Sequence, residues 1–241
     1  MRRVLLCALL LLLAVRALAD DCAVLCEYYA GVAVASRPLL RGWQCPAQGA
    51  ANNQPSSCCS AASPWRGVSC VKNRVASLVL DNIAKTIGGS LPRSIGQLDQ
   101  MAKLNLSAIG ITGSIPSEIG LCNSLTEIHI QENKLTGSLP NELVRVNQLR
   151  IFWGFTNSLT GTIPSELVAL PQLEQFDVGH NNLSGKIPPH LSKSLQYFDV
   201  GQNRLDGPLN DSMFVHLGQI TYAFQGACRY SVVVYNEPPA E

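Results

Sequence analysis

The chain has 241 residues, 15% of them charged, and its formal net charge is +1. This balance excludes the basic excess typical of proteins that bind the phosphates of nucleic acids. Nine cysteines in a chain of this length favour an oxidising compartment, where disulfides form and persist.

The first nineteen residues have the pattern of a secretory signal peptide. Arg2 and Arg3 precede an apolar run from Val4 to Val15, and Ala17–Ala19 forms a small-x-small cleavage site. A membrane anchor is the alternative, but a spanning helix needs ~20 apolar residues. Removing residues 1–19 leaves 15 basic and 17 acidic residues, a net charge near −2. No later segment is long and apolar enough to cross a bilayer, and the last residues carry no retention or lipid-anchor signal. We therefore expect a soluble, secreted product.

Six cysteines cluster between residues 22 and 70 and are candidates for disulfides. In an oxidising compartment, such a cluster holds together a small module that lacks a large core. A zinc site is the alternative, but the cluster contains no histidine and no paired C-x2-C units. We expect no metal and no cofactor. Six cysteines allow 15 connectivities, and the sequence does not choose among them. The candidates are Cys22, Cys26, Cys45, Cys58, Cys59 and Cys70.

Further along the chain, a unit of 24 residues recurs. Successive prolines lie 24 residues apart, and a period of this length indicates a stacked solenoid. Apolar residues alternate at the fourth and sixth positions of each unit, which predicts a short strand with one buried face. Parallel stacking of these strands builds a continuous core. The prolines are Pro92, Pro116, Pro140, Pro164 and Pro188. The strand positions are Leu104, Ile128, Phe152, Phe176 and Phe198, then Leu106, Ile130, Gly154, Val178 and Val200.

An asparagine follows most of the predicted strands. Its amide can donate and accept hydrogen bonds toward the backbone where the chain turns. Ile109 replaces it in the second unit, so that turn needs another partner. A glycine four residues later permits a backbone conformation that a Cβ atom would strain. The asparagines are Asn133, Asn157, Asn181 and Asn203, and the glycines are Gly113, Gly137, Gly161, Gly185 and Gly207.

Two departures from the pattern have local explanations. Gly154 leaves space at a core position, and we expect Phe152 and its stacked neighbours to fill it. Cys122 shares an inward column with Val146 and Leu170. We expect a buried free thiol there, acting as a small hydrophobic side chain, rather than a disulfide partner.

The unit LxxLxLxxNxLxGxIPxxLxxL resembles the plant-specific class of leucine-rich repeat, and "SPWRGVSCVKNRVASLVL" (63–80) is similar to the end of the amino-terminal cap that precedes such repeats. The family includes receptor-like kinase ectodomains, inhibitors of pectin-degrading enzymes and short secreted proteins. The resemblance implies an α/β repeat solenoid: a curved, right-handed stack with a parallel sheet on its concave side. It also implies irregular or 3-10 segments on the convex side and a disulfide-bonded, helical amino-terminal cap.

These patterns divide the chain into four parts. We expect a signal peptide at 1–19, a cysteine-rich cap at 20–73, leucine-rich repeats at 74–217 and a carboxy-terminal cap or tail at 218–241. Gln44–Ser63 is a long, cysteine-bearing insert that ordinary caps of this family lack, and Cys228 has no evident mate nearby.

Strands in register would bring the exposed positions of successive units into columns. The resemblance implies that this concave face binds a protein or peptide. Trp153 and Phe155 would form an apolar patch on it, unless Gly154 distorts the strand and tucks one aromatic ring into the core. The acidic residues suggest a basic group on the partner, although a solvated face accounts for them equally well. The candidate partner-binding residues are Glu127, His129, Gln131, Ile151, Trp153, Phe155, Gln175, Asp177, Tyr197 and Asp199.

Three sequons, at Asn105, Asn182 and Asn210, are candidates for glycosylation. A glycan on Asn105 would block the amino-terminal part of the concave face, so we expect docking on the later repeats. His129 and a neighbouring acid do not make a catalytic site without a nucleophile or a pocket, so we expect no enzyme activity. The alternatives are an inhibitor of a wall-degrading glycosidase, a structural surface protein, or the product of a truncated receptor gene. The sequence leaves the oligomeric state open.

Overall fold

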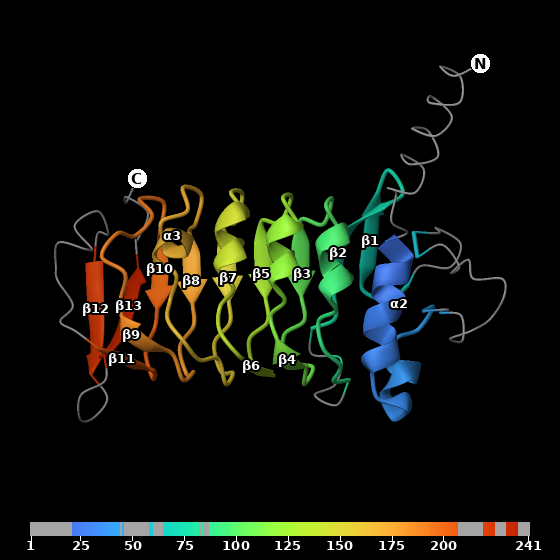
Figure 1. The fold of residues 1–241 in the computed structure, drawn as a ribbon, viewed down its shortest axis with the longest axis horizontal. Coiled ribbons are helices and arrows are strands. Elements are labelled where there is room, and N and C mark those ends of the chain that lie inside the picture. Colours follow the sequence, from blue (N-terminus) through green and yellow to red (C-terminus); the bar gives the residue numbers. More distant parts are fainter. Residues whose placement is uncertain are drawn as a thin grey trace, which may run out of the picture.

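The computed structural model describes residues 21–43, 45, 58–59, 65–81, 83, 87–206, 219–224 and 230–235. Its main feature is a seven-stranded sheet that runs the length of the repeat stack (Figure 1). The first two strands pair antiparallel, and all later neighbours are parallel. In sheet order, the strands are β1 (Val68–Val71), β2 (Arg74–Val79), β3 (Lys103–Asn105), β5 (Glu127–His129), β7 (Ile151–Trp153), β8 (Gln175–Asp177) and β10 (Tyr197–Asp199).

From β3 onward, each strand of the main sheet is only three residues long, because each coil adds one short strand before the chain turns away. The central residue of each strand points into the core, as the alternation predicted. The residue just after the strand is buried too, so both predicted core positions are confirmed. The buried residues are Leu104, Leu106, Ile128, Ile130, Phe152, Gly154, Phe176, Val178, Phe198 and Val200.

Helical turns cover the opposite side of the stack (Figure 1). Three are 3-10 turns and one is a single α-helical turn, and a proline with an extended backbone immediately precedes each of them. Proline suits this place because its fixed φ rigidifies the extended residue that leads into the turn. The turns are η2 (Arg93–Gln97), η3 (Ser117–Leu121), η4 (Asn141–Arg145) and α3 (Ser165–Val168).

Two small pairs of parallel strands lie in the segments that follow the main-sheet strands, where the chain returns toward the next coil. β4 (Thr112–Ser114) pairs with β6 (Lys134–Thr136), and β9 (Ser184–Lys186) pairs with β11 (Arg204–Asp206). The glycine in this segment has a positive φ in several coils, for example +79° at Gly113, which a Cβ atom disfavours. The predicted role of these glycines is confirmed for the described coils.

The predicted asparagine ladder is present and joins adjacent coils. In Asn133, Nδ2 donates to backbone carbonyls of its own coil and to that of Leu106 in the preceding coil. Its Oδ1 accepts from the backbone N–H groups of Ile109, Gly110 and Ile111. The turn that lacks its own asparagine is therefore held by the asparagine of the next coil.

The core contains a stack of three phenylalanine rings. Phe152, Phe176 and Phe198 stack with centroid separations of 5.6 and 5.8 Å. A Cβ atom on Gly154 would lie 3.0 Å from Cε1 of Phe152, so this ring occupies the space that the glycine leaves. Cys122 is a buried free thiol, and its Sγ donates to the carbonyl of Ile95 at 3.1 Å. Both expectations are confirmed.

The amino-terminal region contains a helix and three disulfides. α2 (Asp21–Gly31) is followed by η1 (Val34–Leu39). All six predicted cysteines are paired, and the structure selects the connectivity Cys22–Cys58, Cys26–Cys45 and Cys59–Cys70.

A buried ion pair joins this helix to the first repeat strand. Asp21 is 4% exposed, and its carboxylate accepts from the guanidinium of Arg74 and from the backbone N–H of Val75. Arg74 also contacts Asp99 at 2.7 Å. The helix is therefore fixed to the sheet by charge-assisted hydrogen bonds as well as by apolar packing.

At the other end of the stack, β12 (Gln219–Phe224) and β13 (Tyr230–Tyr235) form an antiparallel pair (Figure 1). The predicted signal peptide, Cys228, Asn210 and most of the insert Gln44–Ser63 lie outside the described residues. Within the described part of the chain, no helix has the length and apolar character that crossing a membrane requires.

Candidate partner-binding surface

The register of the main sheet places the candidate residues in adjacent rows. His129, Trp153, Asp177 and Asp199 are direct neighbours on β5, β7, β8 and β10. A second row lies beside it on the same strands and contains Glu127, Ile151, Gln175 and Tyr197. The predicted columns are therefore confirmed as an arrangement. We call the side of the main sheet that carries these rows the sheet face.

The amino-terminal part of the sheet face is a cluster of polar side chains that contact one another. Nζ of Lys103 lies 2.6 Å from Oε2 of Glu127, and Nε2 of His129 lies 3.2 Å from the same oxygen. The hydrogen bond from Lys103 lowers the pKa of Glu127, and burial lowers the pKa of His129. The side chains of Lys103, Glu127 and His129 therefore already have polar partners within this cluster.

His129 is 7% exposed, so the expectation that it stands in an exposed column is wrong. The indole of Trp153 packs edge-on against the imidazole, with ring centroids 4.8 Å apart. A large ring on the neighbouring strand covers the smaller one because adjacent strands lie only ~4.8 Å apart.

The centre of the sheet face carries partly exposed apolar side chains. Ile151, Trp153 and Phe155 each keep some solvent exposure. The alternative, in which Gly154 tucks one of the two flanking aromatic rings into the core, does not hold because the ring of Phe152 fills that space. Nε1 of Trp153 and Oε1 of Gln131 are themselves buried, and neither has a hydrogen-bond partner among the described residues.

Two carboxylates occupy the carboxy-terminal part of the sheet face. Oδ1 of Asp177 accepts from the N–H of Gly179 at 3.0 Å, and Oδ2 accepts from the hydroxyl of Tyr197 at 3.1 Å. Oδ1 of Asp199 accepts from the N–H of Gly201 at 2.7 Å. Burial raises the pKa of Asp177 to about 6 and also raises that of Asp199.

Asp177 is 7% exposed, so the expectation of exposure is wrong here too. Trp153 and Asp199 flank it on the adjacent strands, and the Tyr197 hydroxyl caps one carboxylate oxygen. The remaining candidates, including Gln175, Tyr197 and Asp199, are partly exposed.

The sequons at Asn105 and Asn182 lie among the described residues, and both side chains are partly exposed. Oδ1 of Asn105 accepts from the backbone N–H and the hydroxyl of Ser107. Asn105 is on β3, in the same row as His129. A glycan attached there would stand over the amino-terminal part of the sheet face, as the sequence predicted.

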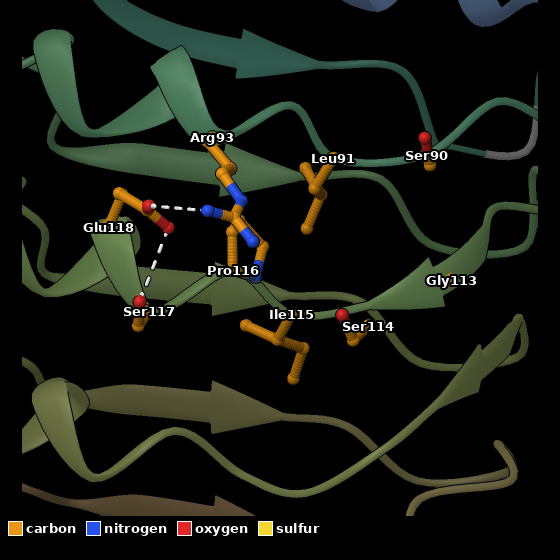
Figure 2. A pocket seen from close by; sticks show the side chains of 9 residues that line it. All are labelled: Ser90, Leu91, Arg93, Gly113, Ser114, Ile115, Pro116, Ser117 and Glu118. Atoms are coloured by element: carbon orange, nitrogen blue, oxygen red, sulfur yellow. Dashed lines mark hydrogen bonds and ion pairs between the residues drawn. The ribbon is translucent and has the colours of Figure 1, made fainter.

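The return side of the coils contains two adjoining hollows that sequence reasoning missed. The first has a volume of about 390 Å³ and the second about 640 Å³, and both are lined by Ser114, Ile115 and Ser117. Figure 2 shows Arg93 facing Glu118 at the first hollow. A guanidinium nitrogen of Arg93 and Oε1 of Glu118 are 4.0 Å apart. The Arg93 side chain is 87% exposed. The signal in the sequence was the small polar residue that precedes the hydrophobic–proline pair in four of the five units.

These hollows are open and polar, and neither brings together a nucleophile, a base and an orienting group. Among the described residues, no group of three or more histidines, cysteines, aspartates and glutamates could hold a metal ion. The sheet face is therefore the surface on which the aromatic and uncompensated charged groups converge.

Comparison with known proteins identifies the repeats. The leucine-rich repeat family model matches residues 124–145 and 172–193. A chain of the BIR3–SERK2 complex from Arabidopsis thaliana is 32% identical, with 77% of this chain and 95% of that chain covered and a TM-score of 0.61. The BIR2 ectodomain from Arabidopsis thaliana is 27% identical, with coverage of 78% and 95% and a TM-score of 0.59.

A larger structure, PEPR1–AtPEP1, shares the fold at 24% identity and a TM-score of 0.62. That match covers 80% of this chain, which spans only 29% of the larger protein. No curated protein sequence gives a significant match.

Proposed function

Because the chain belongs to the plant-type leucine-rich repeat proteins, we propose that it is an extracellular recognition protein that binds a protein or peptide partner on its sheet face. The sheet face is the concave face of this fold. The relatives support the proposal, since the BIR3–SERK2 structure is a complex of two named proteins and the BIR2 structure is an ectodomain.

The observation that carries the proposal is the aromatic patch at the centre of the sheet face. Trp153 and Phe155 are partly exposed, and Ile151 beside them is partly exposed as well. Tryptophan and other aromatic residues are favoured as anchors of protein interfaces because they bury a large area with few rotatable bonds. A partner would complete the burial of these rings.

The scaffold supports binding without a large cost of ordering. Parallel strands, the asparagine ladder and the stacked phenylalanines hold the face in one arrangement. A preformed surface loses little conformational entropy when a partner docks. Three disulfides in the cap agree with an oxidising, extracellular location.

The proposal is tested with Trp153→Ala/Phe155→Ala and a matched control. Leu121 is 50% exposed at the end of η3, so Leu121→Ala removes apolar surface on the other side of the stack. Each protein is immobilised and exposed to extracellular fluid from its source, and the retained proteins are quantified by mass spectrometry. The dissociation constant is then measured with the purified partner.

We expect a partner that wild type and Leu121→Ala retain equally and that the double variant releases. Loss of an interface tryptophan weakens binding by about 2 kcal/mol or more, roughly 30-fold. The thermal midpoint of the double variant should stay close to that of wild type. Equal retention by all three proteins, or a large loss of stability in the double variant, would contradict the proposal.

A further inference from the structure

The two hollows on the return side of the coils form one elongated groove. Their linings share Ser114, Ile115 and Ser117, so the hollow of about 390 Å³ adjoins the hollow of about 640 Å³. The remaining lining residues extend from Ser90 to Thr162, so the groove crosses four successive coils. We call it the return-side groove. Its shape suits an elongated ligand that crosses several coils.

Each coil contributes similar groups to the return-side groove. Figure 2 shows Ser114, at the end of β4, on one side of the first hollow and Ser117 and Glu118 of η3 on the other. In the next coil, Ser138 and Asn141 hold the positions of Ser114 and Ser117. Neighbouring parallel strands lie about 4.8 Å apart, so these polar groups recur at about that spacing along the groove.

The serine hydroxyls of the groove are available to a ligand. Two residues earlier in the same segments, the hydroxyls of Thr112 and Thr136 donate to backbone carbonyls of the preceding coil at 3.2 and 3.3 Å. These two threonines do not line either hollow. Ser114 and Ser138 do line the groove and are exposed, and neither hydroxyl forms a hydrogen bond with another described residue. Each can donate one hydrogen bond and accept others.

The return-side groove has no excess of positive charge. Arg93 is the one lysine or arginine among the described residues that line it, and its guanidinium lies 4.0 Å from Glu118. Glu142 adds a second carboxylate in the next coil. Phosphate, sulfate or uronate groups need basic side chains that offset their charge. The groove therefore disfavours a polyanionic ligand.

The groove also offers little apolar surface. Its aliphatic residues Leu91, Ile115 and Leu139 are only 7%, 4% and 2% exposed, and no aromatic residue lines it among the described ones. A lipid chain or a hydrophobic peptide anchor gains affinity by burying apolar area, and this groove has little to offer it. The ligand that fits is one recognised mainly through hydrogen bonds, uncharged and rich in hydroxyl groups.

We propose that the return-side groove binds a neutral polysaccharide whose successive sugar units lie across successive coils. Ser114 and Ser138 form hydrogen bonds with sugar hydroxyls from one side of the groove, and Asn141 and Glu142 form them from the other. A single sugar binds weakly because the groove is open and lacks an aromatic platform. Affinity grows with the number of linked units that the groove contacts at once. The groove is separate from the sheet face, so this inference goes beyond the proposed function.

An NMR titration of 15N-labelled protein tests the groove. The probes are cellohexaose, mannohexaose and xylohexaose, with glucose as a test of chain length and hexagalacturonate as a test of charge. Ser114→Ala/Ser138→Ala removes the two exposed hydroxyls of the groove. Thr112→Ala/Thr136→Ala is the matched control, because it removes two exposed hydroxyls from the same segments outside the groove. The thermal midpoint of each variant shows that it is folded.

We expect saturable shifts of backbone N–H signals along the groove with at least one neutral hexasaccharide, and little response to glucose or hexagalacturonate. Ser114→Ala/Ser138→Ala should weaken this binding at least about five-fold, and the threonine variant should bind like wild type. Asn141→Ala/Glu142→Gln, on the opposite side, should weaken it as well. No saturable shift with any neutral hexasaccharide, tighter binding of hexagalacturonate, or equal binding by wild type and both groove variants would overturn the inference.

A second variant keeps this inference distinct from the proposed function. Trp153→Ala/Phe155→Ala should retain binding of the hexasaccharide, because neither aromatic residue lines the groove. Loss of the hexasaccharide in this variant, with shifts confined to the sheet face, would place the sugar there and overturn the inference. Peptides are also selected from a displayed random library on wild-type protein. Peptides that displace the hexasaccharide and require Ser114 and Ser138 more strongly than it does would assign the groove to a polypeptide instead.

Discussion

The side-chain amide of Asn181 provides a direct test of how the coils are held together. Its Oδ1 accepts from the N–H of Leu159 at 2.9 Å. Its Nδ2 lies 3.0, 3.0 and 3.1 Å from the carbonyl oxygens of Gly154, Val178 and Gly179. These groups belong to two successive coils, so Asn181→Ala removes a polar connection within a coil and another between coils.

The expected loss follows from what remains buried after the change. Asn181 is 8% exposed, so water has little access to the groups left behind. A buried donor or acceptor without a partner costs about 1–3 kcal/mol. Leu159 loses its acceptor, while the three carbonyls share one NH2 group and count for less than three full bonds. We expect Asn181→Ala to lower the free energy of unfolding by about 3–4 kcal/mol.

The aspartate variant sharpens the test. Asn181→Asp keeps an oxygen for the N–H of Leu159 but places a second oxygen opposite three carbonyls. Repulsion disfavours the ionised form in the folded protein and raises the pKa of the new carboxyl group. A group with a raised folded-state pKa contributes stability at low pH and loses it as pH rises. Asn181→Asp should therefore be less stable than Asn181→Ala at pH 7 and recover toward pH 4.

Urea unfolding, followed by circular dichroism and by tryptophan fluorescence, measures these differences. Asn147→Ala removes an exposed amide outside the ladder and should change stability by less than about 0.5 kcal/mol. If Asn181→Ala cost less than about 1 kcal/mol, or if Asn181→Asp were as stable as wild type at pH 7, the ladder would not have the role assigned to it here.

Three further substitutions test other parts of the structure. A Cβ atom on Gly120 would lie 2.3 Å from the backbone oxygen of Glu142. Gly120→Ala should therefore lower the free energy of unfolding in urea by about 1–3 kcal/mol. An unchanged free energy would contradict this close contact between coils. Thr156 is exposed and has a φ of +53°. Thr156→Gly should raise the free energy of unfolding by about 0.5 kcal/mol, because the relief of backbone strain exceeds the entropy cost of glycine. A loss of stability would show that the site is not strained. The pKa of Asp177 is raised from 3.8 to about 6, so its contribution to stability is present below pH 3.8 and lost as pH rises through 6. Asp177→Asn should therefore raise the thermal midpoint relative to wild type at pH 7.5 but not at pH 4, and a difference independent of pH would refute that pKa.

Much of the fold could be predicted from the sequence because each coil forms the same short strand followed by the same turn. The alternation around Leu104 predicts a strand, and the amide of Asn133 predicts a held turn; the structure has both. Cys122 was identified as buried from its column alone, and it is a free thiol with no exposure. These features depend on the identity of a residue and on its position in the repeat, and the sequence gives both.

The candidate site was only partly readable. The row through Trp153 follows from the period, but the burial of His129 and Asp177 does not. Exposure on the sheet face depends on the sizes of side chains one strand away, such as the indole that covers the imidazole.

The sequence by itself determined the stacked coils, the parallel sheet, the asparagine turns and the set of cysteines available for disulfides. Only the tertiary structure decided which cysteines pair, which carboxylates keep a basic partner and which do not, and where the helical turns approach so closely that Gly120 has no room for a side chain. The physical reason is one of range. A repeated local pattern fixes the shape of each coil, whereas electrostatic pairing and steric fit act between coils and depend on distances that the order of residues does not contain.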